Sequence, residues 1–483
     1  MNQSIQFIIL CLMFLLKNTV LAQNNESLTE TYFSKIKYQN DSAKIAEFVS
    51  LMPKGGDIHH HYTGAIPVEV YLDWAKKMGK HYNTDPQVKS LFVNAPCKNC
   101  MSIDELQKNT TILQRWSIAG FPIPCNQIFD VKQSSNYFFT APNFGAGLEL
   151  RNEKDGFLYL KEQALKEKVQ YIETIYEAPS STNLKVKFPD SYEDSLLFYQ
   201  SKKDSIRANR LLALMLQKME LDKTYNKYIQ QYILQTQKDH EGIDDSYFTL
   251  RLQTYVFRLQ TNVKVFKDLY ACFKTIDLDK TGLFVGVNIV GPENSPNALN
   301  NYWLHMQMFK LLKQKYPGVR LALHAGELVP ALVKNEYLQS NIKNAIEIAG
   351  AERIGHGVDI AYEKDMENSL KMMKARDIPV EINITSNEFI LGVGIHSNTH
   401  PVMLYHKAGV PIIISSDDPG VSGSSLTNEY FKLITRYSFD YKQIKQFVYN
   451  SIQYSFMEES RKKECLKRLG IQFAEFEKQI SLR

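Results

Sequence analysis

The sequence predicts an α/β fold in which eight parallel strands and their helices close into a (β/α)8 barrel. From Met52 onward, short apolar strands alternate with amphipathic helices, which is the pattern of a parallel sheet. About eight such strands are present, the number that a barrel needs. The chain has 483 residues, enough for one large barrel domain with attachments. Hydrophobic residues make up 44% and charged residues 23%, so we expect an ordinary globular protein.

The candidate strands are short apolar runs with helical stretches between them. They cover Gly56–His61, Val169–Tyr176, Phe248–Val256, Leu283–Val290, Val319–His324, Arg353–His356, Val380–Ile384 and Val410–Ser415. Two of the helical stretches are Ser195–Tyr228 and Tyr362–Ala375. The sequence therefore predicts a barrel that occupies residues 51–483.

The interval between the first two candidate strands is too long for one helix. Residues of about 80–145 hold three cysteines and many polar and aromatic residues. We interpret them as a subdomain inserted into the first loop from strand to helix. Residues 23–50 are polar and charged, and they predict a helical extension before the barrel.

The N-terminus resembles a signal peptide. An apolar run, Ile5–Leu16, is followed by Val20-Leu21-Ala22, whose small or modest side chains suit a signal peptidase. The alternative is an uncleaved anchor, but the run is short for a bilayer span. We expect cleavage after Ala22, export to the periplasm or the medium, and no stable membrane association.

Export changes how the six cysteines are interpreted. Cys11 leaves with the signal peptide, and in an oxidising compartment the cluster Cys97, Cys100 and Cys125 favours a local disulfide. Because the mature chain has an odd number of cysteines, at least one thiol stays free or pairs between chains. The remaining cysteines are Cys272 and Cys465. The sequons of the mature chain, which matter only in a eukaryotic host, begin at Asn25, Asn40, Asn109 and Asn383.

A second zinc site is the alternative for Pro96-Cys97-Lys98-Asn99-Cys100. This run matches half of the cytidine-deaminase zinc signature. The other half, H-x-E upstream, is missing, since Tyr82 and Asn83 follow His81. A disulfide is therefore the favoured interpretation.

The charge does not indicate a nucleic-acid partner. The net charge of +5 is the small difference between 57 basic and 52 acidic residues, and it is not concentrated in one tract. The net charge alone does not exclude a basic patch on one face of the protein. The extension and the insertion offer additional surface, so a homodimer is compatible with the sequence.

The first chemical motif is Asp57-Ile58-His59-His60-His61. Because side chains alternate along a strand, His59 and His61 point the same way and could hold one metal ion. A solvent-exposed histidine run is the alternative. The apolar residues before the run and Gly64 after it favour a strand that ends in a turn.

Three further motifs follow predicted strands. His324-Ala325-Gly326-Glu327 places an imidazole and a carboxylate where barrel enzymes keep their catalytic groups. Arg353-Ile354-Gly355-His356-Gly357 has glycines that permit close approach of the backbone, although a lone His is more often structural. Ser415-Ser416-Asp417-Asp418-Pro419-Gly420 carries two acids, of which Asp418 could simply cap a helix.

Together the four motifs predict a zinc site, because they converge at one end of the same barrel. Three imidazoles and one carboxylate suit zinc and leave a position for water. Zinc lowers the pKa of bound water to about 7, and Glu327 and His356 would remain for proton transfer. The fourth strand has no lysine that could bridge two metals, so we expect one zinc ion per chain.

These motifs resemble the adenosine deaminase family from about Met52 to beyond Gly420. Met52-Pro53-Lys54-Gly55-Gly56, the signal peptide and the cysteine-bearing insertion resemble its secreted branch, the adenosine deaminase-related growth factors. The resemblance implies hydrolysis of a carbon–nitrogen bond in a cyclic amidine: adenosine, and 2′-deoxyadenosine, would give inosine and ammonia. The implied zinc ligands are His59, His61, His324 and Asp417.

The resemblance also implies roles for residues around the purine. Glu327 would protonate the ring nitrogen beside the attacked carbon, and its pKa should be raised by burial. His356 would orient and deprotonate the attacking water. Asp418 would hydrogen-bond the five-membered ring, and the Gly291 N–H would contact the six-membered ring. Thr63 stands where intracellular members carry an Asp that meets the sugar 5′-hydroxyl, so recognition of the sugar differs.

Two alternatives stay open. One is deamination of another 6-aminopurine, such as adenine or AMP, although no phosphate-binding loop is evident. The other is a secreted binding protein that acts through the insertion, for which the barrel would be only a carrier. An intact set of catalytic residues argues against the second.

Overall fold

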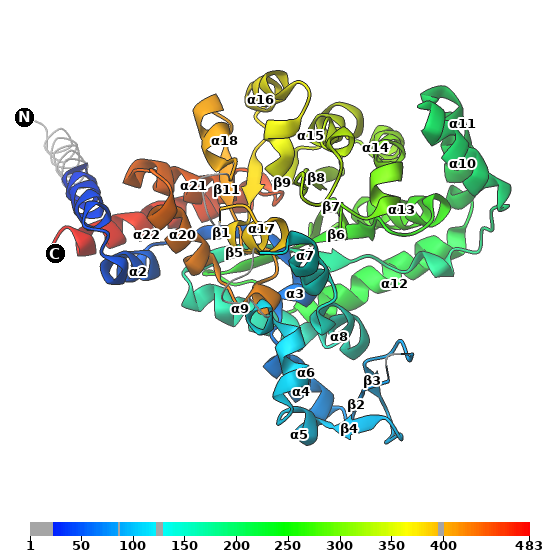
Figure 1. Ribbon diagram of the computed structural model, residues 1–483, viewed down its shortest axis with the longest axis horizontal. Coiled ribbons are helices and arrows are strands. Elements are labelled where there is room, and N and C mark those ends of the chain that lie inside the picture. Colours follow the sequence, from blue (N-terminus) through cyan, green and yellow to red (C-terminus); the bar gives the residue numbers. More distant parts are fainter. Residues whose placement is uncertain (1–22, 86, 122–128, 395–399) are drawn as a thin grey trace, which may run out of the picture.

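The computed structural model describes residues 23–85, 87–121, 129–394 and 400–483. The predicted signal peptide and Cys125 lie outside these residues. Eight parallel strands form a nearly closed barrel with helices around it, which confirms the predicted fold class (Figure 1). In order around the barrel the strands are β1 (Gly55–His61), β5 (Val169–Glu177), β6 (Thr249–Phe257), β7 (Phe284–Val290), β8 (Arg320–Ala325), β9 (Arg353–His356), β10 (Val380–Ile382) and β11 (Ile412–Ile414).

All eight predicted strands are present, and no strand end differs from the prediction by more than two residues. The strands are largely buried on both faces, which is why most of them are rich in apolar residues. The largest shortening is at β11, which begins two residues later and ends one residue earlier than predicted. β10 ends two residues early, because Asn383 already leads into helix α17 (Ile384–Leu391).

The barrel closes where β11 meets β1. There the chain after β11 replaces a full ladder with two backbone hydrogen bonds: the His61 N–H donates to the Asp417 carbonyl (2.8 Å), and the Asp417 N–H donates to the His59 carbonyl (3.0 Å). Closure therefore brings Asp417 beside the histidines of β1, although more than 350 residues separate them in the sequence.

The prediction of one helical stretch over Ser195–Tyr228 was wrong about its continuity. The segment forms three helices, α10 (Ser191–Lys202), α11 (Ser205–Glu220) and α12 (Lys223–His240). Asp204 and Asp222 mark the two breaks, because their side chains cap the N-termini of α11 and α12. The other outer helices are α9 (Glu153–Lys166), α13 (Asn262–Leu278), α14 (Pro296–Lys315), α15 (Asn341–Asn344), α16 (Met366–Ala375), α18 (Val402–Ala408), α19 (Pro419–Ser422), α20 (Leu426–Arg436) and α21 (Tyr441–Gln453).

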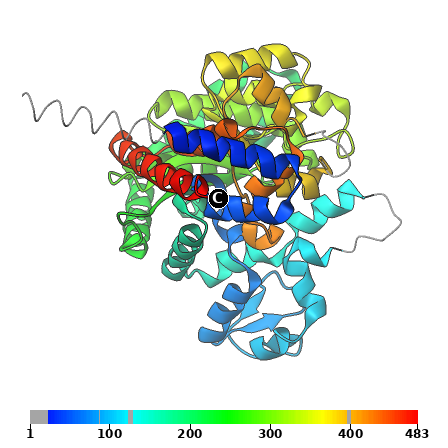
Figure 2. The same ribbon diagram turned by 90° about the vertical axis from the view of Figure 1, so that its left-hand side faces the viewer.

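The two ends of the described chain pack together. Residues 23–38 are helical, and with α2 (Ser42–Leu51) they lie beside the C-terminal helix α22 (Glu459–Ile480) (Figure 2). The Phe48 ring lies 5.0 Å from the Phe476 ring, and the Thr29 hydroxyl donates to the Glu477 carbonyl. The helical extension is thus attached to the barrel through the last helix of the chain.

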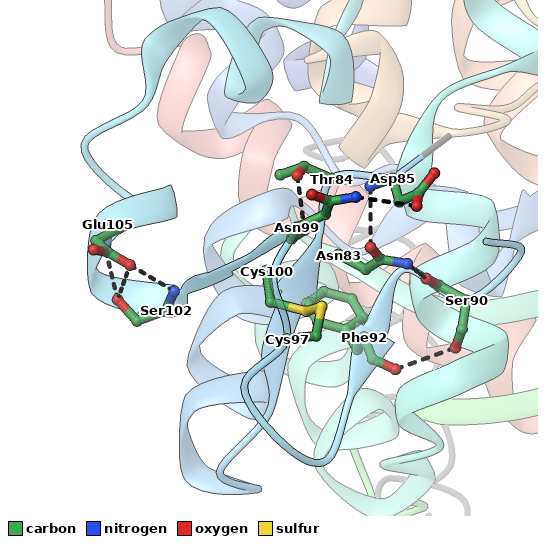
Figure 3. The surroundings of a disulfide bond; sticks show 10 residues. All are labelled: Asn83, Thr84, Asp85, Ser90, Phe92, Cys97, Asn99, Cys100, Ser102 and Glu105. Carbon is green, nitrogen blue, oxygen red and sulfur yellow. Dashed lines mark hydrogen bonds between the residues drawn. A yellow bond between two sulfur atoms is a disulfide. The ribbon is translucent and has the colours of Figure 1, made fainter. Parts of the chain in front are cut away.

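Most of the chain between β1 and β5 lies outside the barrel wall. It contains α3 (Tyr62–Ala65), α4 (Val68–Lys77), α5 (Ile103–Leu106), α6 (Thr110–Leu113), α7 (Val131–Phe139), α8 (Pro142–Leu150) and a small antiparallel sheet of β2 (His81–Asn83), β3 (Phe92–Val93) and β4 (Cys100–Ser102). The sheet projects away from the barrel (Figures 1 and 2), whereas α7 and α8 return to its mouth. A disulfide joins Cys97 to Cys100 beside β4 (Figure 3), and Cys272 and Cys465 are buried free thiols.

Burial excludes one sequon in the folded chain. Asn383 is only 1% exposed and sits among the residues that follow β10, so a glycan cannot reach it without unfolding. Among the described residues, no helix combines the length and the hydrophobicity that crossing a bilayer requires.

The interior of the barrel holds a buried ion network. Arg353 on β9 contacts Glu173 on β5 and Glu381 on β10, each at 2.6 Å. Its guanidinium also lies 3.9 Å from the centre of the Phe456 ring. Glu173 pairs with this guanidinium, whereas Glu381 also contacts His59 and continues the network toward the mouth of the barrel.

We predict that Arg353→Met lowers the free energy of unfolding by about 3–5 kcal/mol, because it removes the guanidinium that pairs with the buried carboxylates of Glu173 and Glu381. Arg320→Met is the matched control. Arg320 stacks on the same Phe456 ring and pairs with Glu352, but its side chain is 44% exposed, so the loss should be about 1 kcal/mol or less. Urea unfolding of both variants measures the difference. Equal losses would show that the buried network contributes no more than a surface pair.

Candidate functional site

The predicted chemical residues meet at the mouth formed by the C-terminal ends of the strands. His59 and His61 end β1, His324 lies near the end of β8 and His356 ends β9. Asp417 follows β11. Since parallel strands of a barrel all point the same way, these side chains converge although their motifs are far apart in the sequence.

The nitrogen and oxygen atoms of this cluster lie close together. His61 Nε2 is 3.2 Å from His324 Nε2 and 3.3 Å from Asp417 Oδ1. His59 Nε2 is 3.6 Å from the same oxygen. Ligand atoms of His59, His324, His356 and Asp417 all lie within 4.8 Å of one another, and those of His61, Asp417 and Asp418 form an overlapping group. The cluster could therefore bind a metal ion.

Outer partners orient two of the imidazoles. His59 Nδ1 lies 2.7 Å from Glu381 Oε2, and His324 Nδ1 lies 2.8 Å from the side-chain oxygen of Asn288. Both partners can only accept, so each Nδ1 carries the proton and each Nε2 turns a lone pair to the cluster. His59 Nε2 is buried and makes no hydrogen bond within the protein, as expected for a metal ligand.

Electrostatics also favour a cation here. Burial opposes ionisation of Asp417, yet the imidazoles of His59 and His61 hold the pKa of its carboxyl well below the usual range. Burial likewise lowers the pKa of His59, but the carboxylates of Asp417 and Glu381 outweigh it and raise that pKa to about 10. The negative field that favours a proton on His59 also favours a metal cation at the same place.

Glu327 supplies an acid beside the cluster. It is buried, and Oε1 lies 3.8 Å from His356 Nε2. Burial, with the negative charges of Asp417 and Glu293, raises the pKa of Glu327 well above its ordinary value. The raised pKa favours the protonated acid, which can donate a proton to a bound molecule.

Glu293 positions the backbone that carries this acid. Its carboxylate accepts from the backbone N–H groups of Gly326 (3.3 Å) and Glu327 (3.1 Å). Arg258 lies 3.5 Å away and compensates its charge. The loop after β8 is thus held by hydrogen bonds rather than left free.

The backbone at the mouth of the barrel is strained at two residues of the site. His356 and Asp417 have φ of 67° and 64°, in the left-handed region that residues other than glycine rarely adopt. Gly355 is needed for a different reason. A Cβ there would lie 2.7 Å from His59 Cε1, so the glycine makes space for that imidazole.

A cavity of about 670 Å³ opens from the cluster. The predicted substrate residues Thr63, Gly291 and Asp418 all line it, together with Glu327. Burial and the charge of Asp417 raise the pKa of Asp418 well above its ordinary value, and its Oδ1 has no hydrogen-bond partner. Asp418 lies against Gly64, where a Cβ would overlap its carboxylate at 1.6 Å. The aromatic part of the lining comes from Phe138, Phe139, Phe144, Tyr255 and Phe257.

The structure thus brings every predicted site residue to one cavity or its floor. Sequence reasoning missed the partners Glu381, Asn288 and Glu293, and Ser386, whose hydroxyl donates to Asp417 Oδ2 at 2.5 Å. Two of them left a signal, because a carboxylate and an amide interrupt otherwise apolar strands, β10 and β7. His60 faces away from the cluster, as the alternation predicted, and pairs with Thr174.

Fold and site together define a (β/α)8-barrel protein whose mouth could hold a metal ion next to a buried carboxyl group with a raised pKa. Sequence comparisons show that this chain has homologues in the adenosine deaminase family. The family model described as "Adenosine deaminase" matches residues 240–471, which include His324, Glu327, His356 and Asp417. The adenosine deaminase of Clostridium perfringens is 29% identical over 181 residues, 38% of this chain and 51% of that protein.

The chain spans about half the length of the curated relatives that it matches. Solved structures align with a larger share of this chain, at lower sequence identity. An adenine deaminase from Arthrobacter aurescens has a TM-score of 0.53 at 16% identity, over 87% of this chain and 99% of its own. The Arabidopsis N6-mAMP deaminase has a TM-score of 0.55 at 17% identity, over 88% and 99%. These likenesses confirm the fold.

Proposed function

We propose that this protein is a zinc-dependent deaminase that hydrolyses adenosine, and 2′-deoxyadenosine, to inosine and ammonia. The observation that carries the proposal is the buried acid Glu327 at the floor of a cavity that also contains the His/Asp cluster. Deamination of a purine ring needs both a nucleophile and a proton for the ring nitrogen. The names of the homologues support this reaction.

The donor set supports one zinc ion per chain, held by His59, His61, His324 and Asp417. Three neutral imidazoles and a carboxylate are ligands that zinc prefers, and Glu381 and Asn288 fix the tautomers of two of them. When bound, zinc would make a water acidic enough to serve as the nucleophile at neutral pH. The residues of β7 include no lysine that could bridge a second metal.

The other side chains have complementary tasks. Glu327 would donate its proton to the ring nitrogen next to the attacked carbon. His356 would orient the attacking water from the neighbouring strand end. Asp418, whose pKa is raised by burial and by the charge of Asp417, would hydrogen-bond the five-membered ring, and Gly291 would contact the six-membered ring through its backbone N–H.

The cavity favours a nucleoside over a nucleotide. Among the described residues that line the cavity, Lys264 is the one lysine or arginine. Its Nζ lies 2.5 Å and 2.6 Å from the two carboxylate oxygens of Asp268, which neutralise its charge. A phosphate would need a free cation or a cradle of backbone N–H groups. Thr63 offers a neutral hydroxyl near the cluster, which suits recognition of a sugar hydroxyl.

We also propose that the chain acts outside the cytoplasm, after cleavage near Ala22, as a member of the secreted growth-factor branch. The disulfide between Cys97 and Cys100 supports an oxidising compartment. Residues of about 80–145, which hold this disulfide, are proposed as an inserted subdomain.

The test is an absorbance assay for adenosine loss, with metal analysis on the same sample. We expect about one zinc ion per chain, rapid turnover of adenosine and deoxyadenosine, and little turnover of adenine or AMP. Removal of the metal with a chelator should abolish turnover, and added zinc should restore it. Preferred turnover of adenine or AMP would replace the proposed substrate, and a metal-free active protein would refute the proposal.

A further inference from the structure

A buried chain of hydrogen bonds reaches His356 from the side opposite the cluster. The backbone N–H of Val402 donates to His400 Nδ1 (3.2 Å), and His400 Nε2 lies 3.1 Å from Asn387 Oδ1. Asn387 Nδ2 lies 2.9 Å from His356 Nδ1. His400, Asn387 and His356 are each 2% exposed or less, so water does not compete for these contacts.

The backbone at one end fixes the direction of the whole chain. A backbone N–H can only donate, so His400 Nδ1 must accept and the proton of this imidazole lies on Nε2. That proton is donated to Asn387 Oδ1, which turns the amide nitrogen toward His356. His356 Nδ1 must then accept, and its own proton lies on Nε2.

Two observations support this direction. Burial lowers the pKa of His400 to about 3, so this imidazole is neutral and carries one proton. A second amide, Asn383 Nδ2, also lies 3.4 Å from His356 Nδ1. Two donors facing one nitrogen disfavour a proton there.

We propose that Asn387 and His400 are positioning residues that hold His356 as its Nε2–H tautomer. His356 then faces the reacting centre as a hydrogen-bond donor, not as the base that the family resemblance implies. The consequence for catalysis rests on the proposed deaminase function, whereas the tautomer itself does not.

The buried imidazoles therefore differ in the hydrogen-bond partner at Nδ1, which determines which ring nitrogen carries the proton. His59 and His324 have acceptors at Nδ1 and present lone pairs to the cluster. His356 has donors at Nδ1 and presents an N–H. This difference is the reason to leave His356 out of the proposed ligand set, although its ring nitrogen lies within 4.8 Å of the potential ligand atoms of His59, His324 and Asp417.

The direct test is nitrogen-15 NMR of the full chain labelled at histidine, before and after removal of metal. His356→Gln identifies the resonances of His356. In the wild type we expect a protonated Nε2 and an unprotonated Nδ1. Asn387→Asp offers an acceptor and should move the proton to Nδ1, and Asn387→Leu should release both tautomers. With adenosine, kcat of both variants should fall about 10- to 100-fold with little change in KM.

His400 gives a matched pair of variants. His400→Phe removes the donor to Asn387 and should lower kcat, whereas His400→Gln supplies an amide N–H and should restore it. His305→Phe is the control for loss of a buried histidine, because His305 is equally buried but lies outside the cavity lining.

A wild-type resonance with the proton on Nδ1 would overturn the proposal. An unchanged Nε2–H tautomer in both Asn387 variants would overturn it as well. If adenosine is not turned over at all, the NMR result still decides the tautomer, so failure of the proposed function and failure of this inference are distinguishable.

Discussion

Glu327→Gln should yield a folded, zinc-loaded protein that deaminates adenosine about 10³-fold more slowly, within the range expected for loss of a general acid. The amide keeps the shape of the protonated carboxyl and its place at the floor of the cavity. It cannot give up a proton to the ring nitrogen, so the attacked carbon cannot become tetrahedral at low cost. Stopped-flow or steady-state absorbance measures kcat, and metal analysis measures zinc.

Glu363→Gln is the matched control for this prediction. Glu363 is also buried, and burial also raises its pKa, but it bonds Ser369 and the Lys343 N–H outside the cavity lining. Its replacement should leave kcat nearly unchanged. Equal activity of Glu327→Gln and the wild type would exclude Glu327 as the proton donor. A biological effect that survived the loss of turnover would instead support the binding role considered from the sequence.

Asp417→Asn should lower the zinc content from about one ion per chain to a small fraction, and turnover should be lost with the metal. The substitution removes the negative charge and one anionic ligand. Asn is the suitable replacement because Asp417 has a φ of 64°, and Asn tolerates this left-handed conformation better than most residues. The backbone hydrogen bonds that close the barrel are unaffected, so the fold should persist.

Asp418→Asn separates loss of metal from disturbance of the loop. Asp418 is the next residue, equally buried, and we place it against the purine rather than among the ligands. Its variant should keep zinc and show a raised KM. Full zinc occupancy in Asp417→Asn would contradict the proposed ligand set, because Asp417 belongs to both groups of potential ligand atoms in the cluster.

The strands could be predicted because each is a local apolar run between turn signals. Burial on both faces requires that pattern in a parallel barrel, so the eight runs marked the eight strands almost to the residue. The helices were predicted less well. The polar stretch from Ser191 to His240 has helical composition throughout, and only the capping side chains of Asp204 and Asp222 divide it.

The chemical motifs could be found for a related reason. A residue at the end of a strand is read directly from the sequence, and the barrel then collects all strand ends at one mouth. His59, His61, His324, Glu327, His356 and Asp417 were all assigned to the site in this way.

What the sequence by itself determined is the fold class and the inventory of reactive groups, since both depend on local patterns repeated along the chain. Only the tertiary structure decided how these groups are held: Glu381 and Asn288 behind two imidazoles, Glu293 behind the acid, and Asn387 with His400 behind His356. The reason is physical. Proton positions and pKa values depend on partners within hydrogen-bond distance, and those partners come from other strands whose register no local pattern specifies.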